Sequence, residues 1–416
     1  MHDTTPGTPG PDAGWEFLFS LPGRDRLLEL ERQFPDRVDT AALVPELRRS
    51  GLGPEETSAL LTQLRLRRQA TAKLGTLFPE HGLLTQAGLE QASRAVVARH
   101  HAERFRSAGL SSVADLGCGI GTESLALAAA GLRVLAVELD PVTARVAAQN
   151  LSAFPEADVR AGDAESAELT GIDAVFLDPA RRTAGHSDTT RLTSAAEYSP
   201  SLDFAFGLAA HRPTGIKLGP GFERELIPAD AEAQWVSVGG SVVEMGLWFG
   251  ALARPGITRS ALVFSGAHGQ SGAHEMTAAA DSPDEAVRDL GGFLYEPDGA
   301  VIRARLIGDL ARSLGAGMVS DKIAYLTADE YMPTPFATGY RILDEVPVKE
   351  RDLRRELAAR GIGTLEIKKR GIDVDPASLR TRLKLKGRAS ATLFLTRVAG
   401  QHTAFLAERV GAGYAT

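Results

Sequence analysis

The sequence predicts an α/β protein whose central part is a doubly wound, mostly parallel sheet. Three observations lead to this fold class. Short apolar runs alternate with helical patterns from residue 113 onward, a glycine-rich turn follows the first run, and acidic residues end the next three runs. The 416 residues exceed the size of one ordinary domain, so we expect a further domain on each side of the sheet.

The first 107 residues contain no convincing strand. Residues 1–14 are rich in Pro, Gly, Thr and Asp and lack an apolar core, so we expect a disordered tail and not a signal peptide. Over residues 15–107, apolar positions recur at helical spacing and Gly and Pro interrupt the pattern. This pattern predicts a small N-terminal helical domain.

The central domain is expected over residues 108–333. Helices over 122–130 and 141–154 join its first three strands, and the later part is less regular. We expect a loop over 265–283 and a turn with a helical stretch over 294–327. The predicted strands are 113–116, 133–137, 157–160, 174–177, 215–218, 234–238, 244–249 and 260–264.

A smaller α/β domain is expected over residues 334–416. Its predicted elements are a strand near 340, helices over 350–360 and 376–383, and strands over 364–369, 391–397 and 402–408. Residues 351–397 hold 13 Lys and Arg against 5 Asp and Glu, a net charge of +8, whereas residues 1–350 carry −15. The total net charge of −7 would argue against binding to nucleic acid, but it averages an acidic part with a basic segment, so it does not exclude such binding.

The basic charge gathers at two places in that segment. Lys368, Lys369 and Arg370 form one cluster, and the second spans residues 380–388. In residues 380–386 polar and apolar side chains alternate, which can place several cations on one face. Such a face could follow a phosphate backbone, or it could be an ordinary solvated surface.

Composition excludes several classes of protein. Apolar residues make up 44% and charged residues 24%, as in ordinary globular proteins. Cys118 is the only cysteine, so an internal disulfide and a zinc site with several thiolates are excluded, and we expect no metal. No apolar run approaches the roughly 20 residues of a membrane span. We therefore expect a cytoplasmic protein with no membrane partner.

The most specific motif spans residues 113–122, where a strand runs into a glycine loop and then a helix. Gly117, Gly119 and Gly121 allow a tight turn and let a ligand approach the backbone. The start of the following helix favours an anionic group. By itself this pattern could be a plain strand-to-helix turn.

The ends of the next strands strengthen the case for a ligand site. Glu138 ends the second strand, where an acidic side chain can accept both hydroxyls of a ribose. Asp163 follows the third strand, where a carboxylate can accept from an adenine amino group, and Asp178 follows the fourth. Asp140 could bind a ligand or cap the next helix.

These motifs resemble those of the class I S-adenosylmethionine-dependent methyltransferases, which have a Rossmann-like domain. Asp115, two positions before the first glycine, matches the acidic residue of their glycine motif. The resemblance implies S-adenosylmethionine as cofactor, with Asp115 and the loop at its methionine part, Glu138 at its ribose and Asp163 with Ala164 beside its adenine. The implied cofactor-binding residues are Gln91, Ser93, Asp115, Gly117, Cys118, Gly119, Gly121, Glu138, Leu139, Asp163, Ala164 and Asp178.

A nicotinamide dehydrogenase is the alternative for the glycine loop. Its fingerprint places the third glycine three positions after the second, whereas Gly121 comes two after Gly119. This spacing favours the methyltransferase.

The segment that begins at Asp178 is expected to be catalytic. In amino-group methyltransferases the related motif is Asp or Asn, two prolines and an aromatic ring. This chain keeps Asp178 and Pro179 but has Ala180 and Arg181 in the last two places, so stacking of a base on a ring there is lost. Arg181 and Arg182 suit a phosphate, a carboxylate or a stacked base, or they pair with local acids.

The position of the lone cysteine narrows the chemistry. Enzymes that methylate carbon 5 of uridine or cytidine in RNA use a cysteine nucleophile, and Cys118 lies in the cofactor loop, far in sequence from Asp178. We therefore expect a nitrogen or oxygen acceptor, with Asp178 as hydrogen-bond acceptor or base.

Further stretches are expected to line the site. Lys217 ends the fifth strand and Glu244 lies on a later one, and each faces the cleft beside Asp178 or is an ordinary surface residue. Residues 88–94, with Gln91 and Ser93, are similar to a segment that several RNA methyltransferases place across the cofactor. A capped surface helix is the alternative there.

The whole chain resembles a bacterial family of methyltransferases with a THUMP-like C-terminal domain. The shared stretches are 89–93, 113–122, 178–182, 294–304 and 367–375. THUMP domains present RNA, usually tRNA, to the enzyme, so the resemblance implies methylation of tRNA or rRNA. The expected catalytic residues are Asp178, Pro179, Arg181 and Lys217. The expected substrate-binding residues are Arg182, Glu244, Lys368, Lys369 and Arg370. The alternatives are a methyltransferase for an anionic small molecule, with an arginine and lysine clamp, and a non-catalytic protein that binds the cofactor or RNA.

Overall fold

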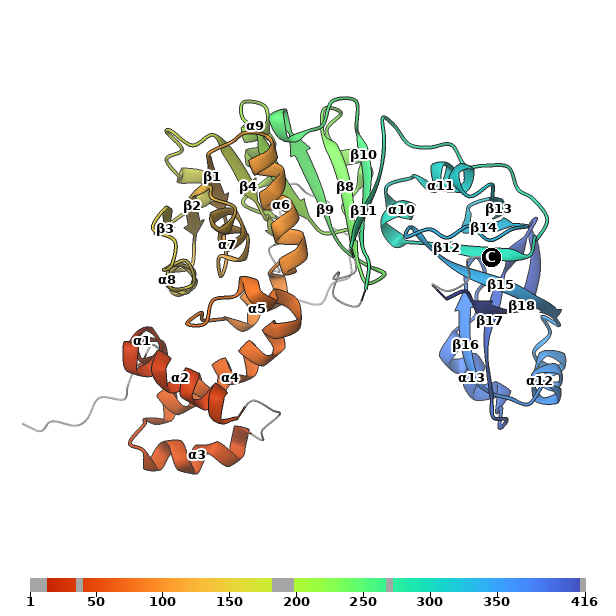
Figure 1. Cartoon of the computed structure of the whole chain (residues 1–416), viewed down its shortest axis with the longest axis horizontal. Helices are drawn as coiled ribbons and strands as arrows, with labels where there is room; N and C mark the ends of the chain where they lie inside the picture. The colour runs from red at the N-terminus through yellow and green to blue at the C-terminus, as the bar shows by residue number, and fades with distance from the viewer. Residues whose placement is uncertain (1–12, 35–39, 182–197, 267–271, 412–416) are drawn as a thin grey trace, which may run out of the picture. The chain divides into compact units, whose positions relative to one another are not determined.

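The computed structural model describes residues 13–34, 40–181, 198–266 and 272–411 (Figure 1). They belong to two compact units, one of residues 1–218 and 247–253 and the other of residues 219–246 and 254–416. Helices fill the N-terminal part, and strands and helices alternate through most of the rest. The predicted α/β class is confirmed.

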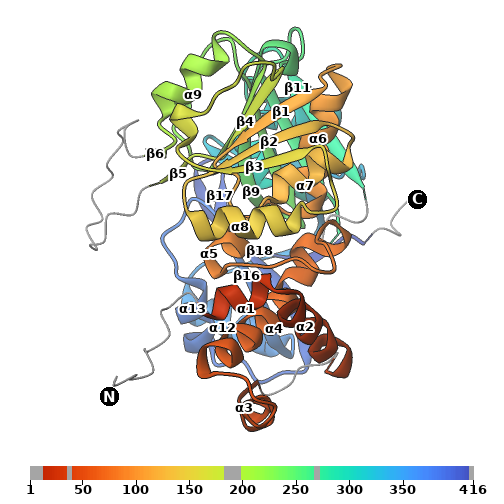
Figure 2. The same cartoon turned by 90° about the vertical axis from the view of Figure 1, so that its left-hand side faces the viewer.

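The N-terminal part of the first unit is helical. Its helices are α1 (Ala13–Phe19), α2 (Leu21–Gln33), α3 (Thr40–Arg49), α4 (Pro54–Leu74), α5 (Gln86–Gln91) and α6 (Ala95–Ser107), with a 3-10 turn, η1 (Gly75–Leu77). Among the described residues up to 107 there is no strand, as predicted. In Figure 2, α1 to α4 group together below α8.

The N-terminal helices share a core with the sheet domain. Buried leucines of α2 and α4 pack in one cluster with Ile120 of the glycine loop and Val146 of α8. The Asn150 amide fixes this contact, since it donates to Leu83 O at 3.0 Å and to Ile120 O at 2.8 Å and accepts from Leu83 N. Such a fully satisfied buried amide sets the position of the helices against the cofactor loop.

The sheet of the first unit is parallel and doubly wound. It contains β1 (Ser112–Leu116), β2 (Arg133–Glu138), β3 (Ala157–Ala161), β4 (Ala174–Leu177) and β7 (Thr214–Leu218), in the order β7-β4-β1-β2-β3. Helices α7 (Thr122–Ala129), α8 (Pro141–Asn150) and α9 (Leu202–Ala209) connect or follow these strands. The order reverses between β1 and β4, and ligands of such sheets bind at this switch point.

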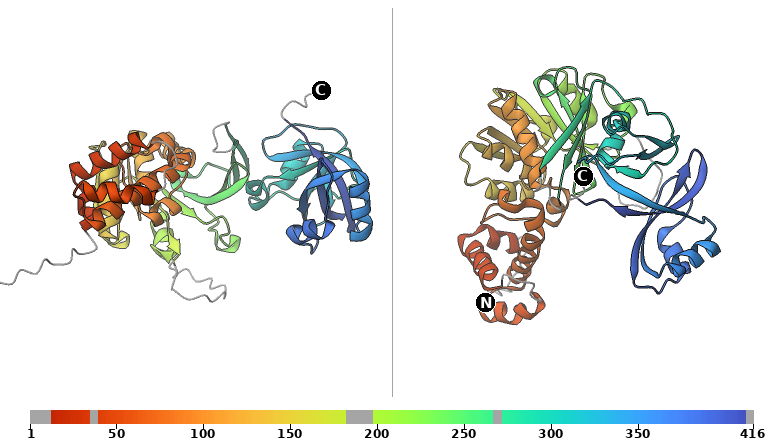
Figure 3. Two further views of the ribbon diagram at one scale, coloured as in Figure 1. Left: turned by 90° about the horizontal axis from the view of Figure 1, so that it is seen from below. Right: turned by 45° about the vertical axis from the view of Figure 1, so that its right-hand side comes forward.

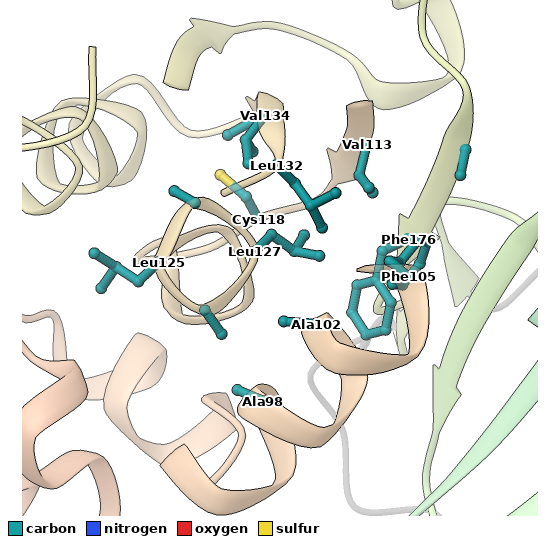
Figure 4. Packing of buried hydrophobic residues seen from close by; sticks show 14 of the residues in the cluster. Ala98, Ala102, Phe105, Val113, Cys118, Leu125, Leu127, Leu132, Val134 and Phe176 are labelled. Atoms are coloured by element: carbon teal, nitrogen blue, oxygen red, sulfur yellow. The ribbon is translucent and has the colours of Figure 1, made fainter. Parts of the chain in front are cut away.

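The core under this sheet is tightly packed. Figure 4 shows side chains of α6 and α7 packed against the strands. The rings of Phe105 and Phe176 are neighbours, with 6.3 Å between their centroids. Gly215 on β7 has no room for a side chain, because a Cβ there would lie 2.7 Å from the Trp248 ring. Each large apolar side chain that is fully buried in this core contributes about 1.5–3 kcal/mol to the stability of the fold.

Short elements complete the first unit. They are the strands β5 (Ala180–Arg181) and β6 (Tyr198–Ser199), which pair with each other, and the 3-10 turns η2 (Ala164–Ser166) and η5 (Gly250–Leu252). β9 (Ser241–Phe249) begins in the second unit and ends in the first.

The second unit begins with three strands and the turn η4 (Arg224–Leu226). β8 (Glu232–Val238) pairs in parallel with β10 (Arg259–Phe264), which pairs antiparallel with β11 (Ala273–Ala278). The expectation of a loop over 265–283 is therefore wrong over β11. Most β11 side chains are exposed or half-buried, so the strand has no apolar alternation, and backbone pairing with β10 defines it.

A seven-stranded sheet forms the rest of the second unit, in the order β13-β14-β12-β15-β18-β17-β16. Figure 3 shows it from two further directions, with its last strands in blue. Its strands are β12 (Phe293–Pro297), β13 (Gly317–Ser320), β14 (Ile323–Ala328), β15 (Ala337–Val346), β16 (Ile362–Lys369), β17 (Ala389–Val398) and β18 (Gln401–Arg409). The helices are α10 (Gly299–Arg303), α11 (Ile307–Ser313), α12 (Glu350–Ala359) and α13 (Pro376–Leu383).

This sheet begins earlier in the chain than expected. β12, β13 and β14 lie within residues 293–328, where the sequence predicts a turn and a helical stretch, and they join the strands that follow residue 334. These strands are short. β12 lies between β15 and β14, whereas β13 and β14 pair with each other across a short turn. The predicted boundary at residue 334 thus divides one sheet.

The expected alternation over residues 380–386 is wrong as a strand pattern. Arg380 and Arg382 lie on α13, which Asp375 caps by accepting from Ser378 N at 2.8 Å and which Pro376 begins. Arg382 pairs with Glu350 at 3.0 Å. On a helix, alternate residues do not share a face, so this segment presents no single row of cations.

In the described part of the chain, no helix has both the length and the apolar composition to cross a membrane. The same residues hold no group of three or more His, Cys, Asp or Glu side chains that could bind a metal ion.

Candidate active site

The glycine loop follows β1 at the switch point of the sheet. Gly117, Gly119 and Gly121 have φ of 86°, 56° and 81°, which is the left-handed region that glycine enters without strain. The N–H groups of Gly117 and Cys118 both donate to Val137 O on the neighbouring strand, at 2.8 and 3.0 Å. A Cβ on Gly119 would meet only open space, so the loop leaves its backbone accessible to a ligand.

Asp115 lies at the end of β1 and is buried. Ser124 Oγ of α7 donates to its Oδ2 at 2.5 Å. Burial raises the pKa of Asp115 to about 7, and the Ser124 hydrogen bond opposes this rise. A buried carboxylate with so high a pKa favours a cationic ligand group that would replace its proton.

Glu138 holds the loop from the end of β2. Its Oε2 accepts from Gly119 N and its Oε1 from Asp140 N, both at 2.9 Å. Each oxygen keeps acceptor capacity for a hydroxyl. Leu139 beside it is 65% exposed, an apolar surface at the same strand end.

Two further acids cap helical turns. Asp140 Oδ1 accepts from Thr143 N at 2.8 Å, so the helix-cap interpretation of Asp140 is confirmed. Asp163 Oδ1 accepts from Glu165 N at 3.0 Å, and Ala164 behind it is buried. Asp163 lies at the carboxyl end of the sheet with Glu138, and its contact with adenine stays a prediction.

Asp178 follows β4 and forms an ion pair with Lys217 at the end of β7, the neighbouring strand. Their side chains are 32% and 12% exposed, so water screens the pair only in part. Lys217 Nζ also donates to Gln91 O at 3.3 Å. The structure thus brings together Asp178, Lys217 and the backbone of Gln91, which the sequence placed in one site.

The segment around Gln91 is docked onto the glycine loop. A Cβ on Gly88 would lie 2.3 Å from Ile120 Cγ2, so α5 approaches the loop as closely as its backbone allows. Ser93 just after α5 is buried. Its expected contact with the cofactor stays a prediction.

The sequence interpretation missed Lys73. This residue lies in the last turn of α4, and its Nζ donates to Leu89 O at 2.6 Å and Glu90 O at 2.8 Å. Burial, together with the charges of Lys217 and Arg94, lowers the pKa of Lys73 to about 8. Nothing in the local sequence separates it from other helical lysines, because its neighbours come from distant elements.

A buried pair supports the start of α7. His101 Nδ1 lies 3.2 Å from Glu123 Oε2, and both residues are buried. Burial alone would raise the pKa of Glu123, but the charge and hydrogen bond of His101 outweigh it and lower that pKa.

The structure describes the remaining expected site residues to different extents. Pro179 is buried after β4, Arg181 lies on β5, and Arg182 is outside the described residues. Cys118 is buried and its pKa is raised well above the usual value by burial, which suits a loop residue. Glu244 is buried on β9 in the second unit, and its expected place beside Asp178 stays a prediction.

Lys368, Lys369 and Arg370 divide between two sides of β16. Lys368 and Arg370 line a cavity of the second unit that Lys369 does not reach. Lys368 Nζ donates to Glu296 Oε2 at 2.6 Å. Burial opposes the charged form of Lys368, but the Glu296 carboxylate outweighs it and raises the pKa of Lys368.

The doubly wound sheet, the glycine loop and the acidic strand ends define an α/β domain that binds a nucleoside cofactor. A family model described as a methyltransferase domain matches residues 114–180, and one described as THUMP domain-like matches residues 337–409. Two proteins from Mycobacterium tuberculosis strains CDC 1551 / Oshkosh and H37Rv are 35% identical over 342 residues, covering 80% of this chain and 90% of theirs. Both are named uncharacterized S-adenosylmethionine-dependent methyltransferases.

A crystal structure of a provisionally named methyltransferase from Porphyromonas gingivalis W83 has the same fold. It is 20% identical, with a TM-score of 0.70 over 95% of this chain and 96% of that one. The chain belongs to the S-adenosylmethionine-dependent methyltransferases and carries a C-terminal THUMP-like domain. It is an enzyme, and its cofactor is S-adenosylmethionine.

The residues at the switch point fit this cofactor. The ammonium group of the cofactor is complementary to the buried Asp115 carboxylate, and its ribose hydroxyls are complementary to the oriented Glu138 carboxylate. The exposed Leu139 offers an apolar surface for its adenine ring. The open backbone at Gly119 leaves room for the methionine part.

Proposed function

We propose that the enzyme methylates a nitrogen or oxygen atom of a structured RNA, either tRNA or rRNA. The single observation that carries the proposal is the Asp178–Lys217 ion pair at the carboxyl ends of β4 and β7, next to the switch point. A charged hydrogen-bond acceptor at this strand end supports the proposal, because the family resemblance implies that the methyl acceptor enters beside Asp178.

The roles of the chain's residues follow from this arrangement. The bound cofactor supplies an electrophilic methyl group. Lys217 holds the Asp178 side chain through their ion pair, and the carboxylate orients the acceptor N–H or O–H and takes its proton as the new bond to the methyl carbon forms and the bond from that carbon to the cofactor breaks. Pro179 is buried beside Asp178 and fixes the backbone there.

Two features support RNA as the substrate. THUMP domains present RNA, and the THUMP-like match spans residues 337–409. Residues 351–397 carry a net charge of +8 within an otherwise acidic chain. A basic domain attached to an acidic catalytic part suits a polyanionic substrate.

A second candidate is methylation of an anionic small molecule. Lys73, Arg94 and Lys217 are close enough to interact electrostatically, and Lys73 also interacts with Asp178. Three cations around the transfer carboxylate could hold a phosphate or carboxylate of the acceptor without any contribution from the C-terminal domain.

Mass spectrometry of nucleosides from cells with and without the gene tests the choice. We expect one N- or O-methylated nucleoside to disappear from RNA in cells without the gene and to return when it is restored. If every methylated nucleoside persists while a methylated small anion disappears, the second candidate replaces the first.

A further inference from the structure

The second unit contains a cavity with a volume of about 750 Å³. Its walls come from the turn after β8, the end of β10, the segment from β12 to α10, and the THUMP-like strands. This volume is within the roughly 300–1,000 Å³ of small-ligand sites, so the cavity can take one nucleotide-sized group.

Three cations line the cavity, namely Lys368, Arg370 and Arg409. Aromatic rings support two of them. The Arg370 guanidinium lies 5.0 Å from the centroid of the buried Tyr325 ring, and Lys368 Nζ lies 5.5 Å from that of Tyr340. These rings restrict the two cationic side chains.

The acidic residues of the cavity are engaged within the protein. Glu296 pairs with Lys368. Asp298 accepts from Ser237 Oγ and from Ala300 N, both at 2.8 Å. In contrast, neither Arg370 nor Arg409 has a carboxylate partner among the described residues.

Glycine backbone forms another part of the lining. Gly239, Gly240 and Gly266 have φ of 59°, 80° and 83° and are exposed. A Cβ at position 240 would meet nothing within 4 Å. Because these three glycines have no side chains, a ligand can approach the main chain closely there, as phosphate groups do in glycine loops.

We propose that this cavity binds a phosphate group of a ribonucleotide, with the Arg370 and Arg409 guanidiniums as its anion ligands. Arginine forks match phosphate oxygens, and the three cations of the lining outnumber its two carboxylates, of which Glu296 is paired with Lys368. An excess of cations argues against a metal ion, and the charged lining argues against an apolar ligand. The phosphate can belong to a free nucleotide or to an RNA strand.

The proposal rests on the proposed function only for the choice of a ribonucleotide. Binding to the cavity is measured without methyl transfer, so a failure here leaves the methylation account standing. Conversely, loss of the RNA methylation account would leave a phosphate site in the second unit.

The test uses the full-length protein saturated with S-adenosylhomocysteine, so that the cofactor site cannot take up nucleotide. Calorimetry measures UMP and inorganic pyrophosphate, and fluorescence anisotropy measures a short single-stranded oligoribonucleotide. The variants are Arg370→Gln and Arg409→Gln, with Arg370→Lys to keep the charge and remove the fork. Lys349→Gln, an exposed cation outside the cavity and outside the basic segment 351–397, is the matched control.

We expect each Arg→Gln change to weaken binding about tenfold or more and Lys349→Gln to change it little. Binding of UMP or pyrophosphate with this pattern identifies a free nucleotide as the source. Binding of the oligoribonucleotide alone with the same pattern identifies an RNA phosphate. The proposal is overturned if no probe binds, or if Arg370→Gln and Arg409→Gln bind as the unchanged protein does while circular dichroism shows all variants folded.

Discussion

The cofactor end of the first unit and the basic cavity of the second unit arrange charge in different ways. At the cofactor end, Glu138 is fixed by N–H groups of Gly119 and Asp140, all within the unit of β1, α7 and β2 and the residues just after it. In the cavity, Lys368 is fixed by Glu296, 72 residues away. A site built from local backbone geometry leaves a sequence motif, whereas a site built from distant pairings does not.

The largest expected effect is at the transfer carboxylate. Asp178→Asn removes the charge that orients the acceptor and takes its proton, so we expect methyl transfer to fall about 10²–10⁴-fold. Cofactor affinity, measured by calorimetry, should remain. Asp203→Asn, an exposed acid on α9, is the matched control. Transfer at the unchanged rate in Asp178→Asn would remove Asp178 from the mechanism.

Glu138 tests the cofactor end by binding. Glu138→Ala deletes the ribose acceptors and frees the Gly119 N–H, so we expect S-adenosylmethionine to bind about ten- to a hundredfold more weakly. Glu156→Ala, an exposed acid that follows α8, should bind as the unchanged protein does. Equal affinities for the two variants would show that Glu138 serves only the loop.

The basic cluster of Lys368, Lys369 and Arg370 tests the second unit through the salt dependence of RNA binding. If RNA is the substrate, its affinity should fall steeply with salt. Replacing Lys368, Lys369 and Arg370 by Gln should then reduce the salt slope by about one for each phosphate that is no longer neutralised. Anisotropy with a labelled RNA measures both the affinity and the slope. An affinity that does not change with salt would favour the anionic small molecule.

Asp115 gives a pH dependence of the stability of the cofactor-free protein. Burial holds its pKa near 7 in the folded chain, well above its ordinary value of 3.8, so the folded state binds more protons than the unfolded state between these values. Its contribution to stability is therefore full below about pH 4 and is lost as the pH rises to 7. Without cofactor, the free energy of unfolding of Asp115→Asn should therefore rise relative to that of the unchanged protein as the pH increases over this range. A constant difference would contradict the raised pKa.

The first unit was largely predictable because its signals are local. The strands β1 to β4, the glycine loop and the cap at Asp140 each follow from a few adjacent residues. The Asp178–Lys217 pair follows from topology, since both residues end neighbouring parallel strands. No local pattern indicates Lys73, whose partners are carbonyls of a different helix.

The second unit was predictable only in part for the same reason. The helix α13 has its own cap and proline and was found at its observed bounds. β11 is mostly exposed, and β12 to β14 are short strands that join the sheet through the pairing of β12 with β15, so neither group carries a clear alternation. The cavity at Arg370 and Arg409 arises only when these strands are side by side.

The central claim is that the enzyme transfers a methyl group to RNA and that the Asp178 carboxylate acts in this transfer. The most direct measurement incubates the purified enzyme with S-adenosylmethionine carrying a deuterated methyl group and RNA from cells without the gene, and identifies the labelled nucleoside by mass spectrometry. The account predicts one N- or O-methylated nucleoside with the label, absent with Asp178→Asn. No labelled nucleoside with the unchanged enzyme, or equal labelling with both, would contradict it.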